Sequence, residues 1–264
     1  MVILFTTTFS PISGTFIRQS LPPHPRLILD ANRLAALQDY LQNNTQAQTY
    51  YQGLLQQGEV ILTLDPLPRP PEGSGDILAA ARAVLQRLYV VSLLYRITKN
   101  DTWAERARIE LLNCTQWQDW DIINHALDTG ELCHATGIAL DWTYDYLSTQ
   151  HADSLQIIIN GMVDKGMIPF RQAYNHSVPG WWSLNPSNWA TVTNGGAGIA
   201  ALALLGEENV PQWIENEILP GAIAGVNSSV SCPYKTDGEG YNLTDHGGKV
   251  VFIMVMLHVI LFPL

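Results

Sequence analysis

Charged residues are scarce in this sequence, and basic ones are scarcer than acidic ones. Only 14% of the 264 residues are charged, and 14 Lys and Arg stand against 24 Asp and Glu, a formal net charge of -10 at pH 7. Beyond residue 120 the only basic side chains are Lys165, Arg171, Lys235 and Lys249. This balance argues against nucleic acid and anionic membrane surfaces as partners.

Cysteines are few and strand patterns nearly absent. The three cysteines, Cys114, Cys133 and Cys232, show no C-x-x-C spacing, and an odd number cannot pair completely within one chain. We therefore expect neither a disulfide framework nor a metal site. Strand signals are nearly missing before residue 227, while 47% of the residues are hydrophobic and supply a sizeable core. Together these absences predict an all-α protein.

Asparagine sequons are frequent instead. Six N-x-[ST] sequons with a non-proline middle residue indicate a secreted glycoprotein; they begin at Asn43, Asn100, Asn113, Asn175, Asn227 and Asn242. The N-terminus itself is a poor signal peptide, because its apolar stretch has no basic residues before it.

Three regions are expected along the chain. Residues 1–23 are predicted to be a leader or a disordered segment, 24–238 a helical domain, and 239–264 a divergent apolar tail. The tail is shorter than the roughly 20 apolar residues that span a bilayer, so we expect no stable membrane span. A packed core segment, a weak tail anchor and a misread gene end are the alternatives for it.

Apolar helices alternate with amphipathic ones along the domain. Asp30 and Asp101 are predicted to cap two of the helices. The expected helices cover residues 31–44, about 46–57, 77–98, 101–113, 127–147, 149–167, 188–206 and 209–226, with a Pro- and Gly-rich loop at 64–75. Such repeated αα-hairpins stack as a solenoid or curl into a toroid. No short consensus repeat is visible and the pairs differ in length, which favours an incomplete (α/α) toroid of antiparallel helical hairpins.

An ordered set of motifs accompanies these helices. "HPRLIL" stands near the start, "HALDTGE" and "ALDWTYDYL" follow from residue 125, and "WW" precedes "NWATVTNGG" at 188–196. This succession resembles the N-terminal toroid of the heparinase II/III-like polysaccharide lyases, relatives of alginate and chondroitin lyases. The likeness covers roughly residues 24–238. A tyrosine-rich segment and a β-sandwich domain follow in the family; "TDGEGYNLTDHGG" starts in a similar way and then departs, so the chain is expected to be a truncated form.

The resemblance implies β-elimination on a uronic-acid-containing glycan, without a cofactor. That reaction needs neutral or cationic donors for the C5 carboxylate, a base for the C5 proton and an acid for the leaving oxygen. Two alternatives are a glycoside hydrolase that uses carboxylates such as Glu131 and Asp141, and an inactive fragment that only binds sugar.

The resemblance makes Asn188, Tyr241 and His125 the catalytic candidates. Asn188 is expected to donate to the substrate carboxylate, with helix capping by the Asn and Thr residues of 188–194 as the alternative. Tyr241 is the one tyrosine in the segment that begins like the family's tyrosine-bearing stretch. His125 is preferred over His134 and His176 because it lies beside the acidic residues of "HALDTGE".

The candidates for sugar binding are three tryptophans and two polar residues. Trp181, Trp182 and Trp189 are expected to stack on pyranose rings, with ordinary core packing as the competing interpretation. Asn194 is placed with them, although the glycines after it indicate close helix packing instead. Glu131 and Asp128 share one helix face, where they serve either the substrate or an internal network.

Overall fold

The computed structural model describes residues 21–72, 74, 77–184 and 187–231. Within these ranges every regular element is a helix and no strand is present, which confirms the all-α prediction. Most of the predicted leader, the whole predicted tail and Tyr241 lie outside the described residues.

The helices follow the predicted order with some changes in length. They are α2 (Ala31–Asn43), α3 (Thr45–Thr63), α4 (Ile77–Thr98), α5 (Asp101–Thr115), α6 (Ile122–Gln150), α7 (Ala152–Met162), η1 (Val163–Met167), α8 (Ile168–Tyr174), α9 (Asn188–Leu204), η2 (Ile214–Ile218) and α10 (Leu219–Ser231). The second helix is longer than expected, since α3 runs to Thr63.

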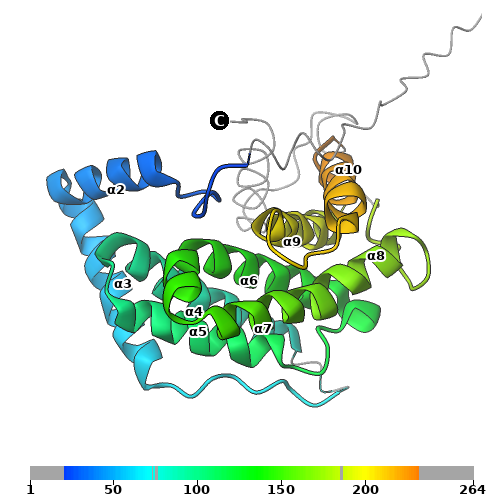
Figure 1. Ribbon diagram of the computed structural model, residues 1–264, viewed down its shortest axis with the longest axis horizontal. Coiled ribbons are helices and arrows are strands. Elements are labelled where there is room, and N and C mark those ends of the chain that lie inside the picture. The colour runs from blue at the N-terminus through cyan, green and yellow to red at the C-terminus, as the bar shows by residue number, and fades with distance from the viewer. Residues whose placement is uncertain (1–20, 73, 75–76, 185–186, 232–264) are drawn as a thin grey trace, which may run out of the picture.

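Three helices, α4, α6 and α9, form a parallel inner row with α6 in the middle (Figure 1). Gly130 of α6 lies against Thr193 of α9, and Gly137, seven residues on, lies against Ala200, also seven residues on. Contacts between α4 and α6 advance in the same direction, from the Arg82–Glu131 pair to the hydrogen bond from Tyr95 to Asp145. The N-terminal ends of all three helices therefore lie at one end of the molecule.

The connecting helices form an outer row. α5 returns from α4 to α6, and α7, η1 and α8 together return from α6 to α9. α5 and α7 are neighbours in this row, where the Arg108 guanidinium donates to Ser154 Oγ at 3.0 Å. This is the predicted alternation of inner and outer helices.

The helix α4 is long and apolar enough to cross a membrane by length and composition alone. In this structure it packs against α3, α5 and α6, and Val84, Leu88 and Val91 on it are fully buried. Its largely apolar composition matches this packing against neighbouring helices on several sides.

Two caps test the predicted helix starts. Asp30 caps α2 as expected, because its side chain accepts a hydrogen bond from the Arg33 N–H at 2.9 Å. The predicted cap of α5 was wrong by one residue: Asn100 accepts from the Thr102 N–H, and Asp101 is the first helical residue. Asn and Asp cap equally well, so their order alone does not choose between them.

The segments that follow α6 and α9 each contain a π-helical turn followed by a proline. η1 ends two residues before Pro169, and η2 ends two residues before Pro220. Proline lacks an N–H and its ring clashes with the carbonyl four residues earlier, so a wider turn relieves the helix there. The predicted single helix over 149–167 is therefore divided, and α8 continues it to Tyr174.

Close contact between α6 and α9 depends on two glycines. A Cβ on Gly196 would overlap the Gly130 carbonyl, and a Cβ on Gly130 would come within 2.8 Å of Thr193 Cα. Both obstacles are backbone atoms, which cannot rotate away. The predicted role in close helix packing is confirmed for Gly196, and its partner Gly130 was not predicted.

We predict that Gly196→Ala lowers the free energy of unfolding by about 1–3 kcal/mol, the usual cost of overpacking a core. Urea denaturation of the purified protein measures it. The matched control is Gly53→Ala in α3, where an added Cβ would meet nothing within 4 Å; it should gain about 0.5–1 kcal/mol from helix propensity. Equal effects of the two changes would contradict this account of the packing.

Candidate functional site

The parallel register brings the two most specific motifs together. His125 precedes Gly130 by five residues, and Asn188 precedes Thr193 by five residues. Because Gly130 lies against Thr193 in parallel helices, the backbones of His125 and Asn188 are at the same height on neighbouring helices. The side chain of His125 lies outside the described part of the structure, so this juxtaposition is one of backbone positions.

Asn188 is exposed and is the first residue of α9. Ser187 caps this helix, since its side chain accepts from the Ala190 N–H. The hydroxyls of Thr191 and Thr193 donate to carbonyls of the preceding turn, Ser187 and Trp189. Capping therefore does not account for Asn188, whose side chain has no hydrogen bond to the described residues.

The three tryptophans divide into a surface pair and a core residue. Trp181 is 59% exposed, and its ring centroid lies 5.2 Å from that of the half-buried Trp189. Trp182 is 1% exposed and packs edge-on against Phe170 with centroids 5.3 Å apart. The pair next to Asn188 thus offers aromatic surface, whereas Trp182 follows the core-packing interpretation.

Asn194 is fully buried and its amide is used within the protein. Tyr174 donates its hydroxyl to Asn194 Oδ1 at 2.7 Å, and Nδ2 donates to the carbonyls of Ser183 and Ala190 at 2.9 and 2.8 Å. These bonds join α8, the following loop and α9. The structure gives Asn194 a structural position and no route to a ligand.

Glu131 pairs with a cation that was not among the predicted site residues. Arg82 of α4, well exposed, places Nε 3.4 Å from Glu131 Oε1. Burial raises the pKa of Glu131, and the nearby guanidinium opposes that shift. Asp128 is buried in the same helix. The pair Arg82–Glu131 is thus an inter-helix contact close to the surface. Residue spacing within a single helix could not predict it, because the two residues lie on different helices.

The other histidines do not join Asn188. His134 is buried and bonded to the Tyr89 hydroxyl, and burial lowers its pKa to about 3, so the imidazole is neutral. His176 is exposed in the turn after α8 with a φ of 62°. Tyr241 lies outside the described residues.

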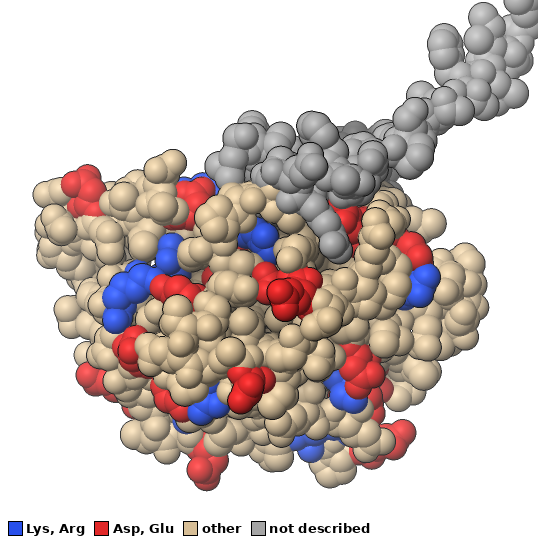
Figure 2. Space-filling view, viewed as in Figure 1, with Lys and Arg blue, Asp and Glu red and all other residues tan. Residues whose placement is uncertain are grey.

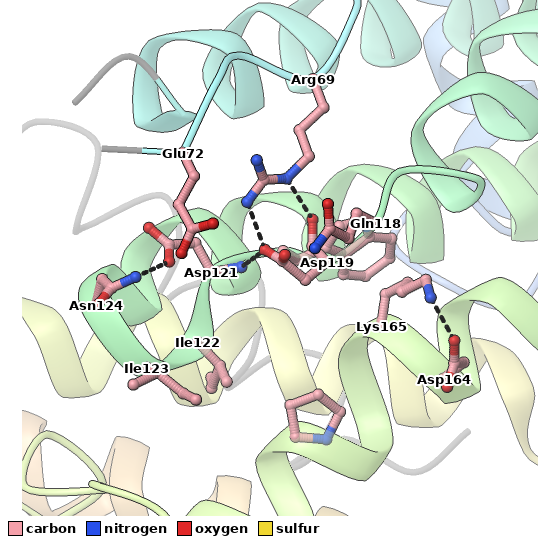
Figure 3. A pocket seen from close by; sticks show the side chains of 12 residues that line it. Arg69, Glu72, Gln118, Asp119, Asp121, Ile122, Ile123, Asn124, Asp164 and Lys165 are labelled. Atoms are coloured by element: carbon pink, nitrogen blue, oxygen red, sulfur yellow. Dashed lines mark hydrogen bonds and ion pairs between the residues drawn. The ribbon is translucent and has the colours of Figure 1, made fainter. Parts of the chain in front are cut away.

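A pocket of about 320 Å³ opens at the N-terminal end of α6 (Figure 3). It was not predicted. Its two cations are already paired: Arg69 lies 2.7 Å from Asp119, and Lys165 lies 2.5 Å from Asp164. The lining contains Arg69, Glu72, Gln118, Asp119, Trp120, Asp121, Ile122, Ile123, Asn124, Asp164, Lys165 and Pro169. Four carboxylates against two cations give the pocket negative charge.

The motif "HPRLIL" anchors the N-terminal segment through buried Asp141 of α6. His24 Nδ1 donates to the Asp141 carboxylate at 2.5 Å, and the N–H groups of Arg26 and Leu27 donate to it at about 2.8–3.1 Å. His24 Nε2 reaches Glu207 at 3.1 Å. These residues hold the segment against both α6 and the end of α9.

These hydrogen bonds to Asp141 count against the glycoside hydrolase alternative, in which Asp141 and Glu131 would act as a catalytic pair. Asp141 is fully buried, and its oxygens accept from the segment just described. Glu131 is ten residues earlier in the same helix, a rise of about 15 Å, whereas paired glycosidase carboxylates lie about 5–9.5 Å apart. The two acids do not form such a pair.

The described side chains form no cluster of potential metal ligands. No group of three or more His, Cys, Asp or Glu side chains among them is arranged to hold a metal ion. Cys114 and Cys133 are buried free thiols, and Cys232 lies outside the described residues.

Two comparisons with known proteins found nothing similar. No protein-family model matches the chain, and no curated protein matches it in sequence.

The tryptophans provide a direct test of the surface and core assignments. We predict that Trp182→Ala costs about 3–5 kcal/mol of unfolding free energy, as expected for an aromatic removed from a core. Trp181→Ala should change it by less than about 0.5 kcal/mol, because the side chain is exposed. Chemical denaturation followed by far-UV circular dichroism measures both, and similar losses in the two variants would contradict the assignment.

His24 predicts a specific pH dependence of stability. Burial lowers its pKa, but the hydrogen bonds to Asp141 and Glu207 outweigh burial and the Arg26 cation, so the pKa is raised. The stabilisation is therefore complete below the ordinary pKa of about 6.5 and is lost as pH rises through the folded value.

We predict that His24→Gln lowers stability at pH 6 by about 2 kcal/mol, the scale of hydrogen bonds to charged groups. The gap from the unmodified protein should narrow as pH rises above about 6.5. Thermal unfolding across pH measures it. The control is His176→Asn at an exposed turn position, where Asn tolerates positive φ; a gap that stays constant with pH would refute the charged role of His24.

Proposed function

We propose that this chain is a lyase-like protein that binds a uronic-acid-containing glycan at the N-terminal ends of its inner helices and cleaves it by β-elimination. The observation that carries the proposal is the grouping of exposed Asn188 with the Trp181–Trp189 pair, level with His125. Asn188 is neither a cap nor a core residue, so it is available as a donor.

The proposal includes an (α/α) toroid. The parallel inner row and the outer row of returning helices are the local arrangement that such a ring requires. In such a ring the inner helices run parallel, so their N-terminal ends surround a common opening. The motifs at the starts of α6 and α9 would then border the opening where a glycan chain passes.

In the proposed reaction, the Asn188 amide donates to the C5 carboxylate of the uronate. This neutral donor favours the negative charge that develops as the C5 proton leaves. Tyr241 takes that proton as base, the C5 electron pair forms the C4–C5 double bond, and the C4–O bond breaks. His125 gives a proton to the departing oxygen. No cofactor takes part.

Aromatic rings account for the binding of the sugar faces in this proposal. The Trp181–Trp189 pair provides apolar ring surface beside Asn188, and such surfaces suit the apolar face of a pyranose. On the face seen in Figure 2, most Lys and Arg stand next to Asp or Glu, without a broad basic patch. Recognition of the acidic glycan would therefore use neutral donors more than cations.

The proposal also places the protein outside the cell as a glycoprotein. It is supported by the six sequons. Among the described ones, Asn43, Asn100, Asn175 and Asn227 are exposed and Asn113 is half-buried.

We predict that Asn188→Ala lowers kcat on the active uronate polymer by about 10²–10³-fold, as for loss of one donor to a developing negative charge. Alginate, heparosan, chondroitin and pectin are each incubated with the protein, and the ultraviolet absorbance of the unsaturated product is followed. The melting temperature should stay unchanged.

Ser187→Ala is the matched control, because it removes the cap of α9 and leaves the amide. It should cost about 1 kcal/mol of stability and retain turnover. Oligosaccharide binding is measured in parallel by calorimetry. Binding without unsaturated product would establish the inactive sugar-binding alternative, and neither binding nor product on any of the four polymers would refute the proposal.

A further inference from the structure

The described sequons differ in what their acceptor amides do. In three of them the helix or the core already uses a group that glycosylation needs. Asn43 Nδ2 donates to the Asp39 backbone and side chain at 3.0 Å. Asn113 Nδ2 donates to the Leu67 carbonyl at 2.6 Å.

In the third sequon, at Asn227, the group that the protein already uses is the serine hydroxyl and not the asparagine amide. Asn227 is exposed in the middle of α10, but Ser229 is buried and its hydroxyl donates to the Val226 carbonyl at 2.8 Å. Thr115, in the Asn113 sequon, is likewise buried and donates to the Leu111 carbonyl at 2.7 Å. These hydroxyls are directed into the protein.

The sequons at Asn100 and Asn175 are different. Each asparagine is exposed, precedes an exposed Thr102 or Ser177, and lies at a helix end instead of inside a helix. In each, Oδ1 accepts the N–H of the hydroxyl-bearing residue, at 3.0 Å for Asn100 and 3.2 Å for Asn175. Nδ2 of both has no hydrogen bond to the described residues. The acceptor atom is therefore at the surface, with the sequon folded as a turn.

We propose that Asn100 and Asn175 carry N-linked glycans on the folded protein, and that Asn43, Asn113 and Asn227 do not. The proposal rests on the extracellular location given under Proposed function and is independent of the lyase activity. A glycan is bulky and needs solvent around the acceptor, which these two positions provide.

The transfer uses an oligosaccharide carried on a lipid pyrophosphate. Asparagine Nδ2 forms a bond to the anomeric carbon, and the bond from that carbon to the pyrophosphate oxygen breaks. The pyrophosphate leaves with the electron pair, and Nδ2 gives one proton to a carboxylate of the transferase. The remaining amide N–H and Oδ1 stay in place, so the hydrogen bond that Asn100 accepts at the start of α5 persists after modification.

At Asn113 the same product conflicts with the fold. Its side chain is half-buried where α5 meets the loop around Leu67, and Nδ2 donates to the Leu67 carbonyl. A sugar on that nitrogen would have to displace the loop. Chains modified there are therefore expected to fail folding and to be missing from the secreted fraction.

The experiment expresses the full chain in cultured eukaryotic cells behind an added cleavable secretion leader. Secreted protein is treated with peptide N-glycosidase in heavy-oxygen water, and site occupancy is read by mass spectrometry of its peptides. Occupancy at Asn113 should be at most about a tenth of that at Asn175. Thr102→Ala and Ser177→Ala should each remove one glycan while leaving the asparagine in place.

Asn113→Gln should leave the glycan mass unchanged. Occupancy of Asn113, Asn43 or Asn227 equal to that of Asn175, or empty Asn100 and Asn175, would overturn the proposal. The added leader forces the chain into the secretory pathway, so this outcome does not depend on native targeting. The extracellular location is tested separately in the cells that naturally produce the protein, and it fails if the native protein is found inside those cells.

Discussion

The contact between α6 and α9 is the constraint on which the rest of the arrangement depends. Because Gly130 and Gly196 lack side chains, the two backbones touch, and the register of the helices is set by backbone atoms. Side chains can adopt other rotamers, but backbone contacts of this kind leave few alternative registers. The same contact fixes the relative height of His125 and Asn188, so the packing of the core also determines the geometry of the candidate site.

A buried polar anchor holds the opposite end of this helix pair. Asp141 lies near the C-terminal part of α6 and accepts from His24, Arg26 and Leu27. An ionised carboxylate is costly to bury unless several donors reach it, and here a short N-terminal segment supplies them. Tyr144 extends the anchor, since its ring stacks on His24 and its hydroxyl donates to Glu207 at 2.8 Å. The motif "HPRLIL" thus has a structural role that joins the segment, α6 and the end of α9.

Periodicity predicted most of the fold, because apolar residues at helical spacing report burial directly. It gave α4 and α9 with near-correct bounds, and it placed α6 but began that helix five residues too late. It also gave the alternation of rows. It did not give the turns at η1 and η2, which arise from proline sterics within otherwise helical patterns. At the site, no sequence pattern distinguishes Trp181 from its neighbour Trp182. In the structure Trp182 packs against Phe170, whereas Trp181 is exposed to solvent. The pairing of Arg82 with Glu131 joins residues 49 positions apart, beyond any local pattern.

The distribution of charge separates two regions at the N-terminal end of the inner helices. The pocket beside α6 carries more carboxylates than cations, and both of its cations are paired. A uronate would meet repulsion there, because like charges in a partly enclosed space are poorly screened. The surface around Asn188 and Trp181 offers a neutral amide and aromatic rings instead. Under the proposed function, an acidic glycan would therefore follow the tryptophan side of the helix ends and leave the pocket to water or to groups without negative charge.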